Sequence, residues 1–381
     1  MLVPLHNSPR DYAWGSTTLI ADLEGRTPTG EPEAEIWFGD HPGSPALLPD
    51  GTPLGDWLSS AHAPAGTPTA LPYLLKILAA GSPLSIQAHP SKAQAEIGFA
   101  REEAAGIARD AGHRTYRDDN HKPEIIVALS ERFTALAGLR ELDATRRLLR
   151  EIGPASAPLL EILDADADDA VLREALSWIL SGDASTDVTA IIDAALDAAS
   201  EEFAAELRLV HHLSAHYPGD PGIVVAMLLN LVELQRGQGV FVPAGVLHAY
   251  VAGLGVEIMA ASDNVLRGGL TPKHIDVAEL LEILDSRPGP APVLDPAAAA
   301  IRHFVAGVPD FALVQIAAEA EVSHAVNGVA IAVATTGAPR IIGASSGGAV
   351  DLAPGTAVLI TPDEREIAVL GGEVFLAFPG A

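Results

Sequence analysis

GQGVFVPAGVLHAY, residues 237–250, is the stretch that decides the expected fold. Gly237, Pro243, Gly245 and His248 stand in the spacing G-x5-P-x-G-x2-H. Proline and glycine favour tight turns, so we expect a tight turn between two strands here.

This spacing resembles the second signature of the cupin barrels, which belong to the jelly-roll class. The resemblance implies that a strand runs into the turn and that the next strand returns with His248 facing inward. Ala252 stands where that signature often has asparagine. The first cupin signature usually starts with H-x-H, and this chain has Gln87-Ala88-His89. Residues two apart on a strand point to the same face, so Gln87 and His89 can reach one metal ion from the barrel wall.

A fourth candidate ligand, Glu124, lies in DNHKPEI. With Gln87, His89 and His248 it makes a set of one neutral carbonyl oxygen, two imidazoles and one carboxylate, which zinc accepts. The chain has no cysteine, so a thiolate site is excluded. Glu124 could instead cap a strand or pair with Lys122.

With these residues in hand, the chain resembles the type I mannose-6-phosphate isomerases over about its first three quarters. The matching segments occur in the family's order: YAWGS (12–16), AEIWFGDHP (34–42), LPYLLKIL (71–78), LSIQAHPSK (84–92), NHKPE (120–124), PAGVLHAY (243–250) and EIMAASDNVLRGGLTPKHID (257–276).

The resemblance implies an aldose–ketose isomerase that interconverts mannose 6-phosphate and fructose 6-phosphate through an enediol, with one zinc ion per chain. It makes Gln87, His89, Glu124 and His248 the zinc ligands. The polar groups around the zinc, implied to be catalytic, are His121, Lys122, Asp263 and Arg267. The groups expected to hold the phosphate are Ser85, Lys76 and Lys273.

The few lysines point to the same segments. Of 23 basic residues only four are lysines, at positions 76, 92, 122 and 273, and all lie in or beside the matching segments. Lysine and arginine are not interchangeable where a compact ammonium must meet a phosphate or shift its pKa. This distribution favours functional roles for these lysines.

The composition limits the partners. A formal net charge of −27 argues against nucleic acid and anionic membranes, which need a basic face. The expected sugar phosphate is itself anionic, so its cations must be gathered locally. The absence of cysteine, of an opening signal-like segment and of a long apolar run indicates a cytoplasmic protein. We expect a monomer.

Changes in composition divide the chain into three expected domains. Residues 1–139 and 237–290 form the catalytic cupin domain, with a helix after a capping box at Ser91 and Gln94. Residues 140–236 form a helical insertion, with Asp143 and Asp187 as candidate helix caps. Residues 291–381 form a C-terminal jelly-roll-like barrel without metal ligands. The expected fold class is mainly β with a helical insertion.

Two other functions stay open from the sequence. An iron-dependent cupin oxygenase would be favoured by an H-x-H start, against which Gln87 argues. A non-catalytic sugar-binding cupin would be expected to keep the barrel glycines and lose ligands or the charged groups around them. Trp14 and Trp37 are consistent with either core packing or the lining of a sugar pocket.

Overall fold

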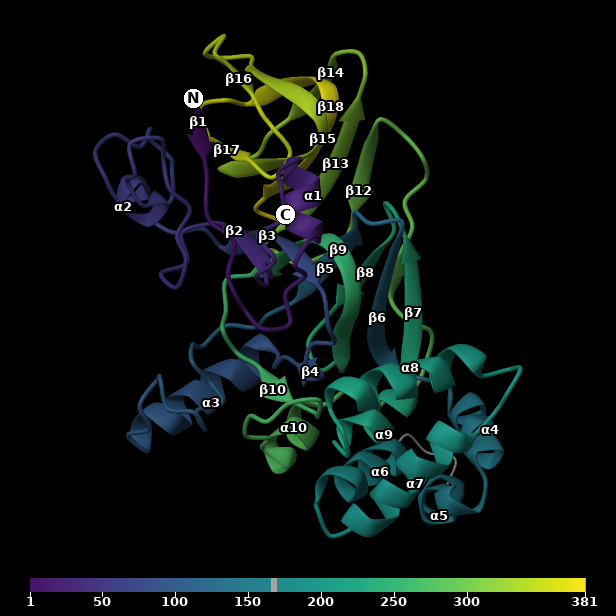
Figure 1. Ribbon diagram of the computed structural model, residues 1–381. Coiled ribbons are helices and arrows are strands. Elements are labelled where there is room, and N and C mark those ends of the chain that lie inside the picture. Colours follow the sequence, from purple (N-terminus) through teal and green to yellow (C-terminus); the bar gives the residue numbers. More distant parts are fainter. Residues whose placement is uncertain (166–169, 381) are drawn as a thin grey trace.

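A computed structural model describes residues 1–165 and 170–380. Figure 1 shows three parts along the length of the molecule, with a central sheet between a C-terminal sheet and a group of helices. Both chain ends lie at the C-terminal sheet (Figure 1). The expectation of a mainly β protein that also contains several helices is confirmed.

The central sheet has ten strands, and β9 is its hub because it pairs antiparallel with β3, β4, β5 and β6. Its strands are β2 (Glu35–Phe38), β3 (Tyr73–Ala80), β4 (Gln87–Ala88), β5 (Glu124–Ala128), β6 (Arg132–Leu139), β7 (Leu229–Gln235), β8 (Gly239–Val242), β9 (His248–Ala260), β10 (Leu266–Arg267) and β11 (Val293–Leu294). The strand–turn–strand predicted from residues 237–250 is confirmed as β8, a turn and β9, with Gly245 at φ 78°.

The C-terminal sheet has eight strands: β1 (Leu2–Leu5), β12 (Ile301–Phe304), β13 (Ala312–Ala318), β14 (Val322–Ala325), β15 (Ala330–Gly343), β16 (Ala349–Asp351), β17 (Ala357–Ile360) and β18 (Glu366–Phe378). The N-terminal strand β1 pairs with β17 and so lies in this sheet. One apolar cluster, which includes Ile36, Leu75, Phe304 and Phe375, joins the two sheets. Among the described residues, the strand pairings close neither sheet into a barrel.

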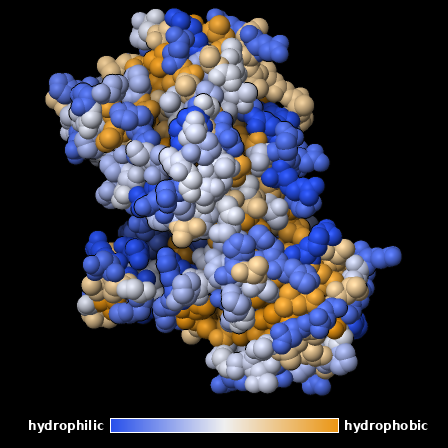
Figure 2. Space-filling view, in the orientation of Figure 1, coloured by the Kyte–Doolittle hydropathy of each residue, from blue (hydrophilic) through white to orange (hydrophobic). Residues whose placement is uncertain are grey.

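Most helices lie together at the other end of the molecule. These are α4 (Leu142–Ile152), the 3-10 turn η1 (Pro154–Ser156), α5 (Ala157–Asp164), α6 (Ala170–Leu180), α7 (Ser185–Asp197), α8 (Ala204–His216) and α9 (Gly222–Met227). Their apolar faces share a core with the neighbouring end of the central sheet. In Figure 2, hydrophobic residues on this side of the molecule gather over the helical end, between more polar ones.

Four helices lie outside this group: α1 (Leu19–Glu24), α2 (Leu54–Leu58), α3 (Lys92–Ala104) and α10 (Val277–Ile283). The capping box at the start of α3 is confirmed, because Ser91 accepts from the backbone of Gln94 and the Gln94 side chain accepts from the backbone of Ser91. None of the helices described is long and apolar enough to cross a membrane.

Three details of the expected helices are wrong. Asp143 and Asp187 do not occupy the N-cap positions of α4 and α7 but lie in their first turns, where a carboxylate still favours the positive end of the helix dipole. The helical stretch ends at Met227 rather than near residue 236, since Leu229–Gln235 forms β7 against β6. Alternating apolar residues in β7 gain more from pairing at the sheet than from continuing a helix.

Candidate active site

Three strand ends bring the expected ligands together. His89 follows β4, Glu124 is the first residue of β5, and His248 is the first residue of β9. The Glu124 carboxylate lies between the two imidazoles, with Oε1 3.3 Å from His89 Nε2 and Oε2 3.3 Å from His248 Nε2. The three side chains are buried, and their ligand atoms lie within 4.8 Å of one another. In the described residues, no other group of His, Asp or Glu meets this test, so none lies in the C-terminal sheet.

Hydrogen bonds set the tautomers of both histidines. His89 Nδ1 lies 2.7 Å from the backbone oxygen of Asn264, and His248 Nδ1 lies 3.2 Å from that of Val246. A carbonyl oxygen only accepts, so each Nδ1 carries the hydrogen and each Nε2 keeps its lone pair. Both Nε2 atoms therefore turn lone pairs toward the Glu124 carboxylate. His89 Nε2 is buried without a hydrogen-bond partner, and a divalent cation would satisfy all three groups.

Electrostatics keep this set in its ligand-competent protonation state. Burial lowers the pKa of His89 to about 4, which keeps its imidazole neutral. Burial raises the pKa of Glu124, but the Lys122 ammonium beside it lowers the pKa, which lies well below its ordinary value. Lys122 Nζ lies 3.1 Å from Glu124 Oε1. Glu124 therefore pairs with Lys122 and at the same time lies between the two imidazoles.

Gln87 lies on the same face as the histidine of β9. It is directly opposite His248 in the β4–β9 pair and opposite Arg267 in the β4–β10 pair. Residues directly opposite each other in antiparallel strands point to the same side of the sheet. The register therefore places the side chains of Arg267, Gln87 and His248 in one row beside the buried cluster. The Gln87 amide nitrogen also donates to Ser85 Oγ at 3.3 Å.

A cavity of about 500 Å³ opens in front of this row. Seven of the residues expected at the site line it: Lys76, Ser85, Gln87, Lys122, Asp263, Arg267 and Lys273. Trp14 and Trp37 line it as well, so both contribute to the pocket wall. His121 does not line it, and its Nε2 lies 2.7 Å from Asp310 Oδ2 instead. The cavity is large enough for a sugar phosphate.

The cations around the cavity differ in their partners. Lys76 Nζ is buried between Glu257 (2.9 Å) and Glu35 (3.4 Å). Burial lowers the pKa of Lys76, but these two carboxylates raise it by more, so it lies above its ordinary value. The side chains of Arg267 and Lys273 have no ion pair or hydrogen bond within residues 1–165 and 170–380. Burial and the nearby Arg117 lower the pKa of Arg267, and burial, Arg267 and Arg117 lower that of Lys273.

Comparison with known proteins places the chain in a family. The profile described as "Phosphomannose isomerase type I, catalytic domain" matches residues 2–142. A mannose-6-phosphate isomerase of Escherichia coli K12 is 41% identical over 291 residues, which are 73% of each chain. The chain belongs to the type I mannose-6-phosphate isomerase family.

More distant members support this placement over the whole length. The mannose-6-phosphate isomerase of Bos taurus is 32% identical and covers 82% of this chain and 81% of its own. A crystal structure of the Salmonella typhimurium mannose 6-phosphate isomerase, bound to its substrate and to zinc, superposes with a TM-score of 0.89 at 34% identity. That superposition covers 100% of both chains.

Several polar residues beside the site were not predicted from the sequence. Glu35 and Glu257 hold Lys76, and Glu35 Oε2 also accepts from the Trp37 indole at 2.9 Å. Tyr250 Oη lies 3.5 Å from Glu124 Oε2, two residues along β9 from His248. Tyr250 could have been predicted, because a residue two positions after His248 on the same strand points to the same face. Nothing in the spacing of Glu35 and Glu257 identifies them, because they meet Lys76 only across the sheet.

A further missed group lies in the helical part. Asp220, between α8 and α9, accepts from three backbone amides: Gly222 (2.7 Å), Leu270 (2.9 Å) and Thr271 (3.1 Å). Leu270 has φ 54°, the one positive φ of a non-glycine residue in the described chain. Leu270 to Lys273 line the cavity. Asp220 therefore holds a strained loop that forms one wall of the site.

Proposed function

We propose that this protein interconverts mannose 6-phosphate and fructose 6-phosphate by zinc-dependent aldose–ketose isomerisation. One observation carries the proposal: a buried set of lone-pair donors lies beside Gln87 and Lys122, and these two residues line one cavity together with two cations, Arg267 and Lys273, that have no partner among the described residues. The buried set suits a divalent metal, and the two cations suit the phosphate of a substrate. Membership of the type I mannose-6-phosphate isomerase family supports both assignments.

His89, Glu124 and His248 would hold the zinc through Nε2, the carboxylate and Nε2, with the Gln87 side-chain oxygen as the fourth ligand. The free Nε2 of His89 and the fixed tautomers support this assignment. When bound, zinc supplies Lewis-acid stabilisation of the negative charge that develops on the substrate oxygens. Two imidazoles, one carboxylate and one amide oxygen favour zinc over iron in an oxygenase site, which commonly has two histidines and a carboxylate without the amide.

The remaining residues supply positioning and proton transfer. Isomerisation removes a proton from the carbon next to the carbonyl and returns one to the neighbouring carbon. Lys122 faces the cavity and contacts Glu124 at 3.1 Å, so we assign it to the proton shuttle. Arg267 keeps its charge at every working pH and would stabilise the enediol. Asp263, bonded to His41 Nε2 at 3.1 Å, lines the same wall.

The phosphate would lie at the side of the cavity that carries Lys273 and Arg267, with Ser85 as a neutral donor. Lys76 also lines the cavity, but its ammonium is already paired with two carboxylates. The phosphate-binding role of Lys76 therefore stays a prediction, because its ammonium has no charge left unpaired for a phosphate. The role of His121 in catalysis likewise stays a prediction, since its imidazole faces Asp310.

The finer fold assignments belong to the same proposal. We assign open jelly-roll barrels to the two sheets, with catalytic (1–139 and 237–290), helical (140–236) and C-terminal (291–381) domains; the last strand of the helical domain, β7, then pairs into the sheet of the catalytic domain. The pairing of β1 with β17 would then tie the first residues of the catalytic domain to the C-terminal one. A monomer in the cytoplasm completes the proposal.

The test is kcat/KM for mannose 6-phosphate and for free mannose on one zinc-loaded preparation. A bound phosphate also helps to orient the reacting carbons, so its loss should lower kcat as well as affinity. We expect mannose 6-phosphate to be favoured by at least about a hundredfold, as one or two charge-assisted contacts would give. Equal values would refute the phosphate assignment, and no turnover of either sugar would refute the isomerase itself.

A further inference from the structure

A second cavity of about 480 Å³ adjoins the one described above, and nothing in the sequence pointed to it. The two share Asp263, Val265, Arg267 and Lys273 as lining residues. On its far side the second cavity is lined by Arg117 and by neighbouring residues of the segment before β5: Gly112, Arg114 and Thr115. His274 completes the lining.

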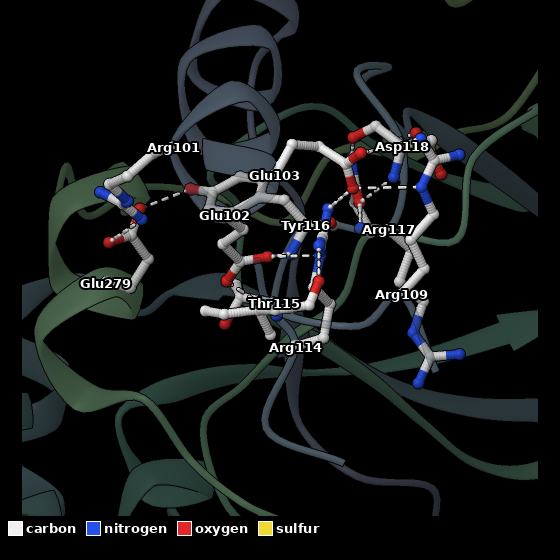
Figure 3. Close-up of polar contacts among 12 residues, drawn as sticks. Arg101, Glu102, Glu103, Arg109, Arg114, Thr115, Tyr116, Arg117, Asp118 and Glu279 are labelled. Atoms are coloured by element: carbon white, nitrogen blue, oxygen red, sulfur yellow. Dashed lines mark hydrogen bonds and ion pairs between the residues drawn. The ribbon is translucent and has the colours of Figure 1, made fainter. Parts of the chain in front are cut away.

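Most arginines near this wall are paired. Arg114 is buried, with ion pairs of 2.8 Å to Glu102 and to Glu103. Arg109 pairs with Glu103 at 3.1 Å, and Arg101 pairs with Glu279 at 2.9 Å. Figure 3 shows this network of arginines and glutamates, with Arg117 next to it. The Arg117 guanidinium has neither an ion pair nor a hydrogen bond among the described residues.

The backbone of Arg117 is held in place. Its N–H donates to Asn264 Oδ1 at 2.7 Å, and the backbone oxygen of the same Asn264 accepts from His89 Nδ1 at 2.7 Å. On the preceding residues, the amides of Thr115 and Tyr116 donate to the Glu102 carboxylate at 3.1 and 2.8 Å. Asn264 thus links the position of Arg117 to that of a metal-cluster histidine, while the Arg117 side chain stays free to meet a ligand.

Arg117, Arg267 and Lys273 line one cavity, and their side chains have no partner in the part of the chain that the structure describes; the formal net charge of the chain is −27. Each acts on the others, because Arg117 lowers the pKa of Arg267 and both arginines lower that of Lys273. The one carboxylate in the lining, Asp263, is bonded to His41. Arg267 is partly buried, and Arg117 and Lys273 are exposed at the cavity. Mutual repulsion between such cations is relieved when an anion binds among them.

We propose that Arg117 is a third cation of the phosphate subsite, so that the phosphoryl group of the substrate lies between Arg117, Arg267 and Lys273. The phosphoryl group of a dianionic sugar phosphate has three terminal oxygens, which can accept from all three side chains. The assignment rests on the proposed function for the identity of the substrate, but not for the binding of phosphate.

The experiment uses the zinc-loaded full chain and the variant Arg117→Gln. We expect KM for mannose 6-phosphate to rise about tenfold or more, as the loss of one hydrogen bond to a charged group would give, with a smaller change in kcat. Inorganic phosphate should compete with the substrate, and its inhibition constant should rise in parallel. Arg109→Gln is the matched control: it removes the same charge from a neighbouring arginine outside the cavity lining, and should leave both constants unchanged.

Calorimetric titration with inorganic phosphate separates this inference from the proposed function. Weaker phosphate binding in Arg117→Gln than in Arg109→Gln would support the subsite even if the wild type does not turn over mannose 6-phosphate. An unchanged KM together with unchanged phosphate affinity would overturn it. Equal losses in the two variants would also overturn it, because they would indicate a general field effect. Non-competitive inhibition by phosphate would overturn it by indicating an anion site separate from the substrate.

Discussion

Asp220 offers a test of how the helical part shapes the active site. Its carboxylate accepts from the backbone amides of Gly222, Leu270 and Thr271 at 2.7–3.1 Å. Close packing adds to the constraint, because a Cβ on Gly222 would lie 2.4 Å from the Leu270 nitrogen. We expect Asp220→Ala to release the loop that carries Lys273 without removing any group that touches the substrate.

The magnitude follows from the contacts. Each hydrogen bond to a charged group contributes a net free energy of about 1.5–3 kcal/mol. Hydrogen bonds from water to the freed amides recover part of this free energy when the loop opens. A left-handed conformation at a residue such as Leu270 costs about 1–2 kcal/mol, which the carboxylate no longer offsets in the variant. A net loss of about 1.4–3 kcal/mol in loop order corresponds to a roughly tenfold to hundredfold fall in kcat/KM.

Steady-state kinetics with mannose 6-phosphate and urea unfolding together measure this effect. We expect most of the change in KM, because the loop holds Lys273 over the cavity. Asp187→Ala, which removes an exposed carboxylate from the first turn of α7, is the control and should change neither KM nor kcat. Unchanged KM in Asp220→Ala, with only a lower free energy of unfolding, would refute the positioning role and leave Asp220 as a structural residue.

Three further predictions concern the buried cluster. Glu124→Ala should lose both bound zinc, measured by elemental analysis, and activity; full zinc occupancy would contradict the ligand assignment. Lys122→Arg keeps the charge but not the compact ammonium, so the rate should fall about 10²-fold if Lys122 transfers the proton; wild-type kinetics would indicate a structural cation. In the metal-free protein the pKa of His89 is lowered from 6.5 to about 4. Between these values the unfolded chain binds a proton that the folded chain does not. The free energy of unfolding should therefore fall as the pH drops from about 6.5 to about 4, by up to about 3 kcal/mol. Urea titrations of the apo form at pH 7.5, 5.5 and 4.5 check this, and equal stabilities would count against a buried neutral imidazole.

The sequence by itself determined the parts of the molecule that depend on short-range spacing. The turn before His248, the capping box at Ser91 and the two-residue spacing of Gln87 and His89 are each contained within a few residues, although the structure ends β4 at Ala88, one residue before His89. Proline, glycine and β-strand periodicity act over a few residues, so these motifs predict the same local structure whatever the segments pack against. His89 and His248 came with such motifs, whereas Glu124 was expected from the resemblance of NHKPE to the family, and the structure brings the three together.

Only the tertiary structure decided which segments meet. Strand β1 pairs with β17 across most of the chain, and Lys76 finds Glu257 as its partner rather than free space. His121 faces Asp310, and Asp220 of the helical part shapes a loop beside Arg267. A two-residue period states which face of a strand is buried but not which strand lies beside it. Partners of buried charges are therefore set by long-range packing, where a carboxylate from a distant strand satisfies a lysine that the sequence alone leaves unassigned.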